Sequence, residues 1–151
     1  MAEGQKLIVS NKRARYDFHL EDRFEAGIVL TGAEVKSLRD GKANLQDAFV
    51  SVKPAGADLY NLYIAPYEQA RTAEQEPKRP RRLLLHKREL DKLRKGTERQ
   101  GYTIVPTRLY FSNGRAKVEV ALGKGKKTHD KRNATAEREA KRAMDRAKKE
   151  R

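Results

Sequence analysis

The dipeptide Asn113-Gly114 separates two runs, residues 103–111 and 115–122, in which apolar and polar residues alternate. Asn and Gly both tolerate the positive φ angles of a type I′ turn, which joins two strands into a tight hairpin. Alternation with a period of two is typical of a strand with one buried face. The segment therefore predicts an antiparallel hairpin that turns Lys117 toward solvent. The side chains expected inside are Val118, Val120 and Leu122.

Other short apolar runs predict about six strands in all. The expected strands include residues 16–20 and 26–30, and a second hairpin formed by 49–53 and 58–65 around a turn at 54–57. Helices are expected over residues 33–39 and along the stripe Leu83, His86, Leu90 and Leu93, which Gly96 ends before a second short helical piece capped at Thr97. These links are too short for parallel crossovers, so the sheet should be antiparallel. Six antiparallel strands of this size tend to close into an OB-like barrel with two or three flanking helices.

The end of the chain differs in composition from the rest. Residues 123–151 carry 12 Lys and Arg against 5 Asp and Glu, yet they contain no Val, Ile, Leu or aromatic residue. Such a segment buries too little apolar surface to offset the entropy lost on ordering. We therefore expect a barrel domain over 1–122 and a basic tail over 123–151 that is disordered alone. Alanines at 136, 140, 143 and 147 favour a helix when a partner binds the tail.

The charge of the chain indicates the class of its partner. The 151 residues carry a net charge of +14, from 35 Lys and Arg against 21 Asp and Glu, which favours a polyanion such as nucleic acid. A second basic cluster, residues 78–82, follows a polar stretch, 69–77, that reads as a long loop. No apolar run approaches the ~20 residues of a membrane span, and no secretory leader is visible. The expected location is therefore the cytoplasm.

Catalytic and metal-binding motifs are not supported by the sequence. There is no Cys, which excludes disulfides, iron–sulfur clusters and thiol catalysis. The three histidines, His19, His86 and His129, are far apart and lack ligand spacing. No phosphate-binding glycine loop or nucleophile motif occurs. We therefore expect a protein that is not an enzyme and that has no cofactor or metal.

Several side chains fit contact with RNA. Residues 11–16 interleave the amide of Asn11 and the cations Lys12 and Arg13 with the ring of Tyr16, a mixture suited to phosphate contact and base stacking. The alternative is a solvated entry to a strand. Glu25 and Glu34 either pair locally, remain solvated, accept hydrogen bonds from base amino groups, or orient a neighbouring Arg.

The tail holds one more candidate group. His129 has no core to join, and its flat ring can stack on a base while its neighbours contact phosphates. Those neighbours are Asp130, Lys131 and Arg132. A plain solvated tail is the alternative for all four residues.

Six blocks in order along the chain resemble the SmpB family of SsrA-binding proteins. The blocks are NKRAR at 11–15, FEAG at 24–27, GAEVKSLR at 32–39, RLLLH at 82–86, GKGKK at 123–127 and HDKR at 129–132. The resemblance covers roughly residues 7–150. It implies a bacterial, cytoplasmic OB-like protein that binds the tRNA-like domain of transfer-messenger RNA (tmRNA, SsrA).

The same resemblance implies a role in ribosome rescue. Together with elongation factor Tu, such a protein delivers tmRNA to ribosomes stalled on messages without a stop codon, and trans-translation tags the incomplete chain. The tail would enter the small-subunit decoding centre and the vacant mRNA channel, and become helical there. The resemblance places His129, Asp130, Lys131 and Arg132 at the decoding centre. The residues it implies for RNA binding are Asn11, Lys12, Arg13, Tyr16, Glu25, Glu34, Lys36, Leu84 and Lys117.

Two other functions remain open alternatives at this point. A general OB-fold binder of single-stranded nucleic acid, or an initiation-factor-like protein, predicts several exposed aromatics on one barrel face. The candidates for that face are Tyr60, Tyr63, Tyr110 and Phe111. A metal-dependent ribonuclease would need a carboxylate or histidine cluster, which the spacing does not show. For Leu84, core packing is the alternative to an RNA contact.

Overall fold

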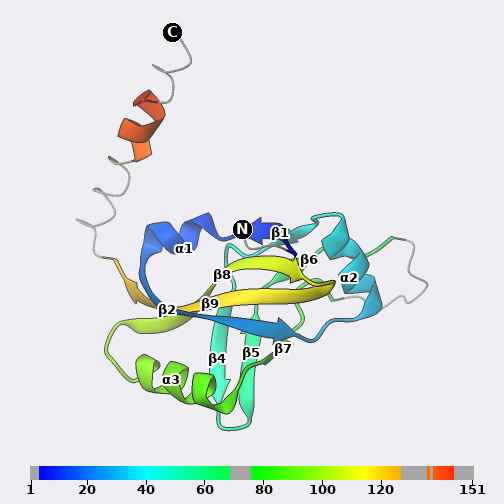
Figure 1. The fold of residues 1–151 in the computed structure, drawn as a ribbon, viewed down its shortest axis with the longest axis horizontal. Coiled ribbons are helices and arrows are strands. Elements are labelled where there is room, and N and C mark those ends of the chain that lie inside the picture. The colour runs from blue at the N-terminus through cyan, green and yellow to red at the C-terminus, as the bar shows by residue number, and fades with distance from the viewer. Residues whose placement is uncertain (1–3, 69–75, 127–135, 137, 145–151) are drawn as a thin grey trace.

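A computed structural model describes residues 4–68, 76–126, 136 and 138–144. Nine strands and three helices are assigned over the body in this part of the chain (Figure 1). The helices are α1 Lys12–Asp17, α2 Gly32–Arg39 and α3 Lys87–Thr97. The strands are β1 Gln5–Ser10, β2 Phe18–Ile28, β3 Ala43–Asn44, β4 Phe49–Lys53, β5 Gly56–Tyr60, β6 Tyr63–Ile64, β7 Arg81–Leu84, β8 Tyr102–Ser112 and β9 Arg115–Gly125.

Six of these strands close into an antiparallel barrel, which confirms the predicted fold class. The hydrogen-bonded order β8-β4-β5-β7-β2-β9 returns to its start because β9 also pairs with β8. Closure leaves no free edge between these six strands. β1 pairs with the second half of β8 outside the ring, and β3 and β6 form a separate two-stranded sheet.

The β8–β9 hairpin forms as the Asn-Gly turn predicts. Asn113 and Gly114 have φ angles of 49° and 79°, the positive values of a type I′ turn. Val118, Val120 and Leu122 are buried, as expected. β9 continues to Gly125, so the barrel extends three residues beyond the boundary expected at 122.

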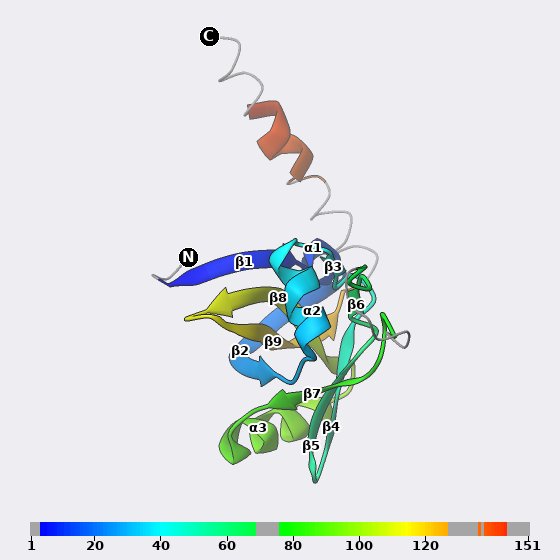
Figure 2. The same ribbon diagram turned by 90° about the vertical axis from the view of Figure 1, so that its right-hand side faces the viewer.

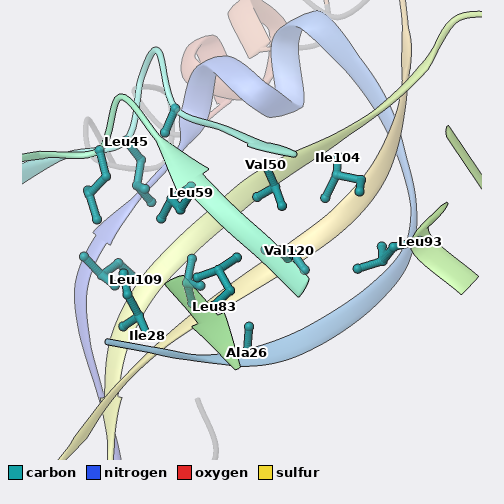
Figure 3. Close-up of a cluster of buried hydrophobic side chains, with 14 of the residues drawn as sticks. Ala26, Ile28, Leu45, Val50, Leu59, Leu83, Leu93, Ile104, Leu109 and Val120 are labelled. Carbon is teal, nitrogen blue, oxygen red and sulfur yellow. The ribbon is translucent and has the colours of Figure 1, made fainter. Parts of the chain in front are cut away.

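The core fills the inside of the ring with aliphatic side chains from every barrel strand and from α3. Figure 3 shows Val50 of β4, Leu59 of β5 and Leu83 of β7 converging on Ile104 and Val120. Leu93 of α3 is fully buried against the same cluster. Truncating such a residue to Ala typically lowers the free energy of unfolding of the protein by about 2–5 kcal/mol.

Residues 12–17 form a helix, so the expectation of a strand entry there was wrong. Asn11 caps α1: its side-chain oxygen accepts a hydrogen bond from the backbone N–H of Ala14 at 3.1 Å. Its amide nitrogen donates to the carbonyl oxygens of Leu45 and Pro106 at 3.1 and 3.0 Å. A buried Asn with its groups satisfied in this way fixes α1 to two other segments of the chain.

The prediction of a helix that begins at Leu83 was wrong for its first residues. Leu83 lies in β7, where it alternates with exposed neighbours, and α3 begins only after His86. Glu89 accepts a hydrogen bond from the backbone N–H of His86 at 3.0 Å, which closes the first turn. Gly96 lies inside α3 rather than ending it. A Cβ at this position would overlap the Leu122 side chain, so glycine lets α3 pack closely on β9. Thr97 is the last residue of α3 and caps no new helix.

The second arm of the β4–β5 hairpin is shorter than expected. Asn61 adopts a φ of 61°, which ends β5 at Tyr60 and reverses the alternation. Leu59 and Leu62 are consequently buried, whereas Tyr60 faces outward and stacks on Phe49 with 5.3 Å between the ring centroids. The prediction of one continuous strand over 58–65 was therefore wrong.

Part of the tail is helical in the structure. Residues 138–144 have helical backbone and exposed side chains, and Figures 1 and 2 both show this segment beyond the α1 end of the barrel. The expected disorder of the free tail stays a prediction. His129, Asp130, Lys131 and Arg132 lie outside the described residues.

We expect a fragment of residues 1–126 to fold without the tail, because it contains every strand of the ring and the aliphatic core. Its urea-unfolding midpoint should lie close to that of the full chain. A fragment ending at 122 should be less stable, because it lacks the pairs of Gly123 and Lys124 with β2 and β8. An unfolded 1–126 fragment would contradict the division into barrel and tail.

Candidate nucleic-acid interface

Glu25, Leu84 and Lys117 meet around one hollow on the outside of the barrel. Gly27 lies opposite Lys117 of β9 on one side and opposite Leu84 of β7 on the other. Glu25 is two residues earlier on β2, so it projects from the same face. All four residues line the hollow. The barrel thus brings together three positions that are up to 92 residues apart in the sequence.

Glycine at position 27 forms the floor of this hollow. A Cβ there would lie 3.3 Å from the Cβ of Leu84, tighter than ordinary van der Waals contact. Leu84 itself is 60% exposed, so the alternative that it packs in the core is wrong. An exposed leucine beside a carboxylate and an ammonium group gives the hollow both apolar and charged contact points.

Tyr110 orients the carboxylate of Glu25. The Tyr110 hydroxyl donates a hydrogen bond to Glu25 at 2.5 Å, and the Arg108 guanidinium lies 4.7 Å from the centre of the Tyr110 ring. Burial, with the hydrogen bond to Glu25, raises the pKa of Tyr110 well above its ordinary value. Tyr110 therefore stays protonated and remains a donor, while Glu25 is exposed and has further lone pairs for a ligand.

A second surface is formed by α1, which is strongly basic. Lys12 and Arg13 are exposed, and Arg13 pairs with Asp17 at 3.3 Å. Tyr16 is half-buried and packs under the guanidinium of Arg138 at 4.9 Å from the ring centre. Asn11 is 5% exposed, with its amide engaged inside the protein, so it holds this helix in place.

Glu34 lies at the centre of a buried ion network. It closes a capping box with Thr31 at the start of α2. Its carboxylate also accepts from Arg79 and from Arg81, the latter through Nε at 2.7 Å. Arg81 is fully buried and donates further to the carbonyl oxygens of Leu62 and Pro77. The network therefore joins α2 to β7 and to the segment before β6.

Burial opposes the charge of Glu34, but the hydrogen bonds from Arg79, Thr31 and Arg81 outweigh it and lower the pKa of Glu34. Burial likewise lowers the pKa of Arg81, and Glu34 opposes that shift. Arg81 nevertheless remains a cation at any ordinary pH. Of the roles expected for Glu34, the structure supports local pairing that orients two arginines.

Lys36 is exposed on the outer side of α2, and its ammonium group lies 5.4 Å from the centre of the Tyr67 ring. A lysine held over a ring in this way is available to an anion while its stem packs on the protein. Lys36 lies on the same helix as Glu34 and is not among the residues that line the hollow around Gly27.

The four aromatics that a general single-strand binder would expose do not share one open face. Tyr110 is 1% exposed and is engaged with Glu25, whereas Tyr63 is 38% exposed on the separate small sheet. Tyr60 and Phe111 are half-buried. The arrangement gives little support to a continuous stacking platform of the kind that sequence-tolerant single-strand binders use.

The described part of the chain contains no group of three or more His, Asp or Glu residues placed to hold a metal ion. Within the same residues, no helix is long and apolar enough to cross a membrane.

The roles of two residues at these surfaces, Tyr110 and Arg81, were not predicted from the sequence. Tyr110 was considered only as an exposed aromatic, and Arg81 only as part of a charge cluster. Both are buried, and each donates a hydrogen bond to a carboxylate that is distant in sequence, Glu25 for Tyr110 and Glu34 for Arg81. Arg81 shares the inner face of β7 with Leu83, whereas Arg82 between them is exposed. A charge on that inner face is explained only by its ion pair with Glu34.

Comparisons with known proteins identify close relatives. The model of the family "SmpB protein" matches residues 8–150. An SsrA-binding protein of Thermobifida fusca is 53% identical over 96% of this chain and 91% of its own. One of Acidothermus cellulolyticus is 54% identical over 95% of this chain and 91% of its own.

A solved structure is similar over most of the chain. It is a chain of "tmRNA-SmpB: a journey to the center of the bacterial ribosome", with a TM-score of 0.69 and 44% identity. The match covers 84% of this chain and 93% of that chain. At this identity and coverage, the likeness extends beyond fold class.

Proposed function

The chain belongs to the SmpB family, and from this premise we propose that it binds tmRNA and acts with it on the ribosome in trans-translation. Relatives at about half identity are SsrA-binding proteins, and the similar solved structure is of tmRNA-SmpB and the bacterial ribosome. The function proposed is recognition of a folded RNA and its delivery to stalled ribosomes. Such a factor works by binding rather than by catalysing a reaction.

The observation that carries the proposal is the hollow around Gly27. It presents the Glu25 carboxylate, the Leu84 side chain and the Lys117 ammonium group together. A carboxylate accepts hydrogen bonds from base amino groups, and an ammonium group pairs with phosphate. An exposed apolar side chain packs against an unstacked base or a ribose. These three kinds of contact in one place suit a folded RNA, which presents bases, riboses and phosphates together, better than a ligand that offers phosphates alone.

The remaining proposed RNA-binding residues divide into contacting and positioning groups. Lys12, Arg13, Tyr16 and Lys36 have accessible groups for phosphate or base contact. Asn11 and Glu34 are buried with internal partners, so we assign them the role of holding α1 and α2 in place. A change at either would weaken RNA binding by moving its neighbours rather than by removing a contact.

The tail is assigned to the ribosome. We infer that His129 stacks on a base at the decoding centre, with Asp130, Lys131 and Arg132 beside it, and that the residues after them lie in the vacant mRNA channel. Composition supports this, because a basic, alanine-rich segment suits a channel lined by phosphates. Delivery with elongation factor Tu and a cytoplasmic location belong to the same proposal.

A binding comparison tests the proposal. The full chain is titrated at one fixed salt concentration against tmRNA, an ordinary tRNA and an unstructured RNA of equal length. We expect the tightest binding to tmRNA, because the hollow and α1 require a folded partner. Equal affinity for all three RNAs would favour the general single-strand binder instead.

Lys117→Ala should weaken binding of tmRNA without unfolding the barrel. Lys117 is half-buried on the outer face, and its inward neighbours Val118 and Val120 are unchanged. Loss of one phosphate contact should reduce the slope of log K against log salt by about 0.9, taking duplex DNA as a guide. The exposed Lys42 serves as the matched control, and Lys42→Ala should keep the original slope. Weaker binding with an unchanged slope would indicate a base contact instead of a phosphate contact.

A further inference from the structure

The basic cluster 78–82 contributes one cation, Arg82, to the hollow around Gly27. Arg81 points inward to Glu34, whereas Arg82, the next residue of β7, projects outward with its side chain 46% exposed. Residues two apart on a strand lie on the same face, so Arg82 shares this face with the exposed Leu84. The hollow therefore contains a second cation besides Lys117.

Two acceptors hold the guanidinium of Arg82 in place. Its Nε lies 3.2 Å from Oδ1 of Asp58, the residue directly opposite on β5. Its Nη1 donates to the carbonyl oxygen of Ala55, in the turn between β4 and β5, at 3.2 Å. A planar guanidinium that is already held at two nitrogens loses less conformational freedom when it binds a ligand.

Gly56 makes room for the guanidinium of Arg82. A Cβ at position 56 would overlap Nη1 of Arg82. Gly56 also has a φ of 145°, a backbone conformation that favours glycine. The β4–β5 turn that contains Gly56 projects on the α3 side of the barrel (Figures 1 and 2), and Ala55 and Gly56 line the hollow themselves. The turn is therefore shaped so that the guanidinium lies across it.

The third nitrogen of this guanidinium, Nη2, is available to a ligand. Within the described part of the chain, Nη2 has no hydrogen-bond partner. The two carboxylates that line the hollow are engaged elsewhere: Glu25 accepts from Tyr110, and Glu89 accepts from the backbone N–H of His86. Neither forms an ion pair with Arg82. Phosphate oxygens are strong acceptors for the N–H groups of a guanidinium.

We propose that Arg82 is a further RNA-contacting residue, which binds a backbone phosphate through Nη2 in the hollow shared with Lys117, and that Gly56 is a positioning residue for it. The inference rests on the proposed function in taking tmRNA as the ligand. A guanine edge is the other acceptor that arginine commonly binds. A phosphate fits better, because Asp58 and Ala55 already occupy two of the three nitrogens.

Substitutions of Arg82 in the full chain test the phosphate contact, with the tRNA-like domain of tmRNA as the probe. Arg82→Gln should weaken binding about tenfold or more, as expected for loss of a charge-assisted hydrogen bond. It should also reduce the slope of log K against log salt by about 0.9, so between 50 and 200 mM salt its affinity should fall roughly 3.5-fold less than that of the wild type. Arg82→Lys keeps the charge and should keep the slope, but it should bind more weakly than the wild type because an ammonium group is not planar.

The matched control is Arg94→Gln. Arg94 is also an exposed arginine paired with an aspartate, Asp91, but it does not line the hollow. Its substitution should leave the affinity and the slope unchanged. Equal effects of Arg94→Gln and Arg82→Gln would reduce the effect to general charge and overturn the proposal. Weaker binding by Arg82→Gln with an unchanged slope would overturn the assignment to phosphate in favour of a base edge.

A double-mutant cycle tests the positioning role of Gly56. Gly56→Ala keeps every charge but displaces the guanidinium, so it should weaken binding roughly threefold or more. In the Arg82→Gln background the same change should have almost no further effect. Gly41→Ala is the control for backbone strain, because Gly41 also has a positive φ, 71°, yet a Cβ there meets nothing within 4 Å. Equal losses from Gly56→Ala in both backgrounds, or from Gly41→Ala, would overturn the positioning role.

Urea unfolding of each variant separates loss of binding from loss of fold, and the binding data are compared at concentrations of urea-free buffer where every variant is folded. The outcome also distinguishes this inference from the proposed function. Failure of the wild type to prefer tmRNA over ordinary tRNA and unstructured RNA would overturn the proposed function and this inference with it. Normal preference for tmRNA by the wild type, with unchanged affinity and slope in Arg82→Gln, would overturn this inference alone.

Discussion

A chain carrying Glu34→Ala is expected to lose about 3–5 kcal/mol of its free energy of unfolding, the typical effect of removing one partner from a buried ion pair. The substitution leaves the fully buried guanidinium of Arg81 without its carboxylate and removes the capping box of α2. Urea unfolding followed by circular dichroism measures the effect. Glu34→Gln should lose less, because its amide oxygen still accepts from Arg81. Arg39→Ala, an exposed change on the same helix, should have almost no effect.

The pH dependence of stability follows from the same network. The pKa of Glu34 is lowered in the folded protein from an ordinary value of 4.5. A lowered folded pKa stabilises the protein above the unfolded value, and this contribution disappears as pH falls through the folded value. The wild type should therefore lose stability below about pH 4.5, and Glu34→Gln should lose less over that interval. A wild type and Glu34→Gln variant with parallel pH profiles would contradict the role given to this carboxylate.

Changing Asp130, Lys131 and Arg132 together to alanine is expected to abolish peptide tagging on stalled ribosomes. The body keeps the hollow around Gly27, so binding of tmRNA should remain nearly intact. Tagging of a nascent chain on a message without a stop codon is measured beside RNA affinity for the same variant. Normal tagging would contradict the decoding-centre assignment. A parallel loss of RNA affinity would move these residues to the RNA-binding surface instead.

Substitutions of His129 test stacking separately from charge. Stacking of a ring on a base contributes about 1–3 kcal/mol. His129→Ala should therefore slow accommodation of the complex on the ribosome more than His129→Phe or His129→Trp. The rate of tagging under single-turnover conditions is the measurement. Equal slowing by all three variants would favour a role for the imidazole nitrogens over stacking.

The parts of the fold that local sequence determines were predicted correctly. Asn113-Gly114 demands a tight turn whatever surrounds it, and residues 33–39 combine helix formers with the Thr31 and Glu34 capping box. α1 could not be recognised by periodicity, because its six residues contain one short apolar side chain, Ala14. The only local sign of α1 is Asn11 as a helix cap. The helix is further held in place by the two hydrogen bonds that Asn11 donates to distant segments, which the sequence does not reveal.

The boundary between β7 and α3 was predicted wrongly for a different reason. Leu83 falls by chance at helical spacing from Leu90 and Leu93, which extended the predicted helix backward over a strand. The inner face of β7 consists of Leu83 and Arg81, and a charge on an inner face conceals strand alternation. Only the fold brings Glu34 to Arg81, so no property of the cluster 78–82 taken alone could reveal the strand.

The candidate site was predicted residue by residue but not as an arrangement. Glu25 and Leu84 lie in two of the motif blocks and Lys117 was expected on the outer face of the 115–122 strand, and barrel closure brings the three together around Gly27. Tyr110 was missed as the donor to Glu25, because that contact crosses from β8 to β2 over the intervening β9. The decisive information is strand order, which a single sequence does not contain.

The backbone N–H of Lys126 donates to the carbonyl oxygen of Asp17, the last residue of α1, at 2.8 Å, which fixes the start of the tail beside α1. Nine residues, 127–135, separate Lys126 from Ala136, and a chain of that length spans at most about 35 Å. The cations at 138–142 therefore cannot move farther from α1 than this length allows, so a ligand held at α1 meets them at a raised local concentration. Inserting residues between 127 and 135 would lower the local concentration of these cations at α1 without changing any contact within the barrel.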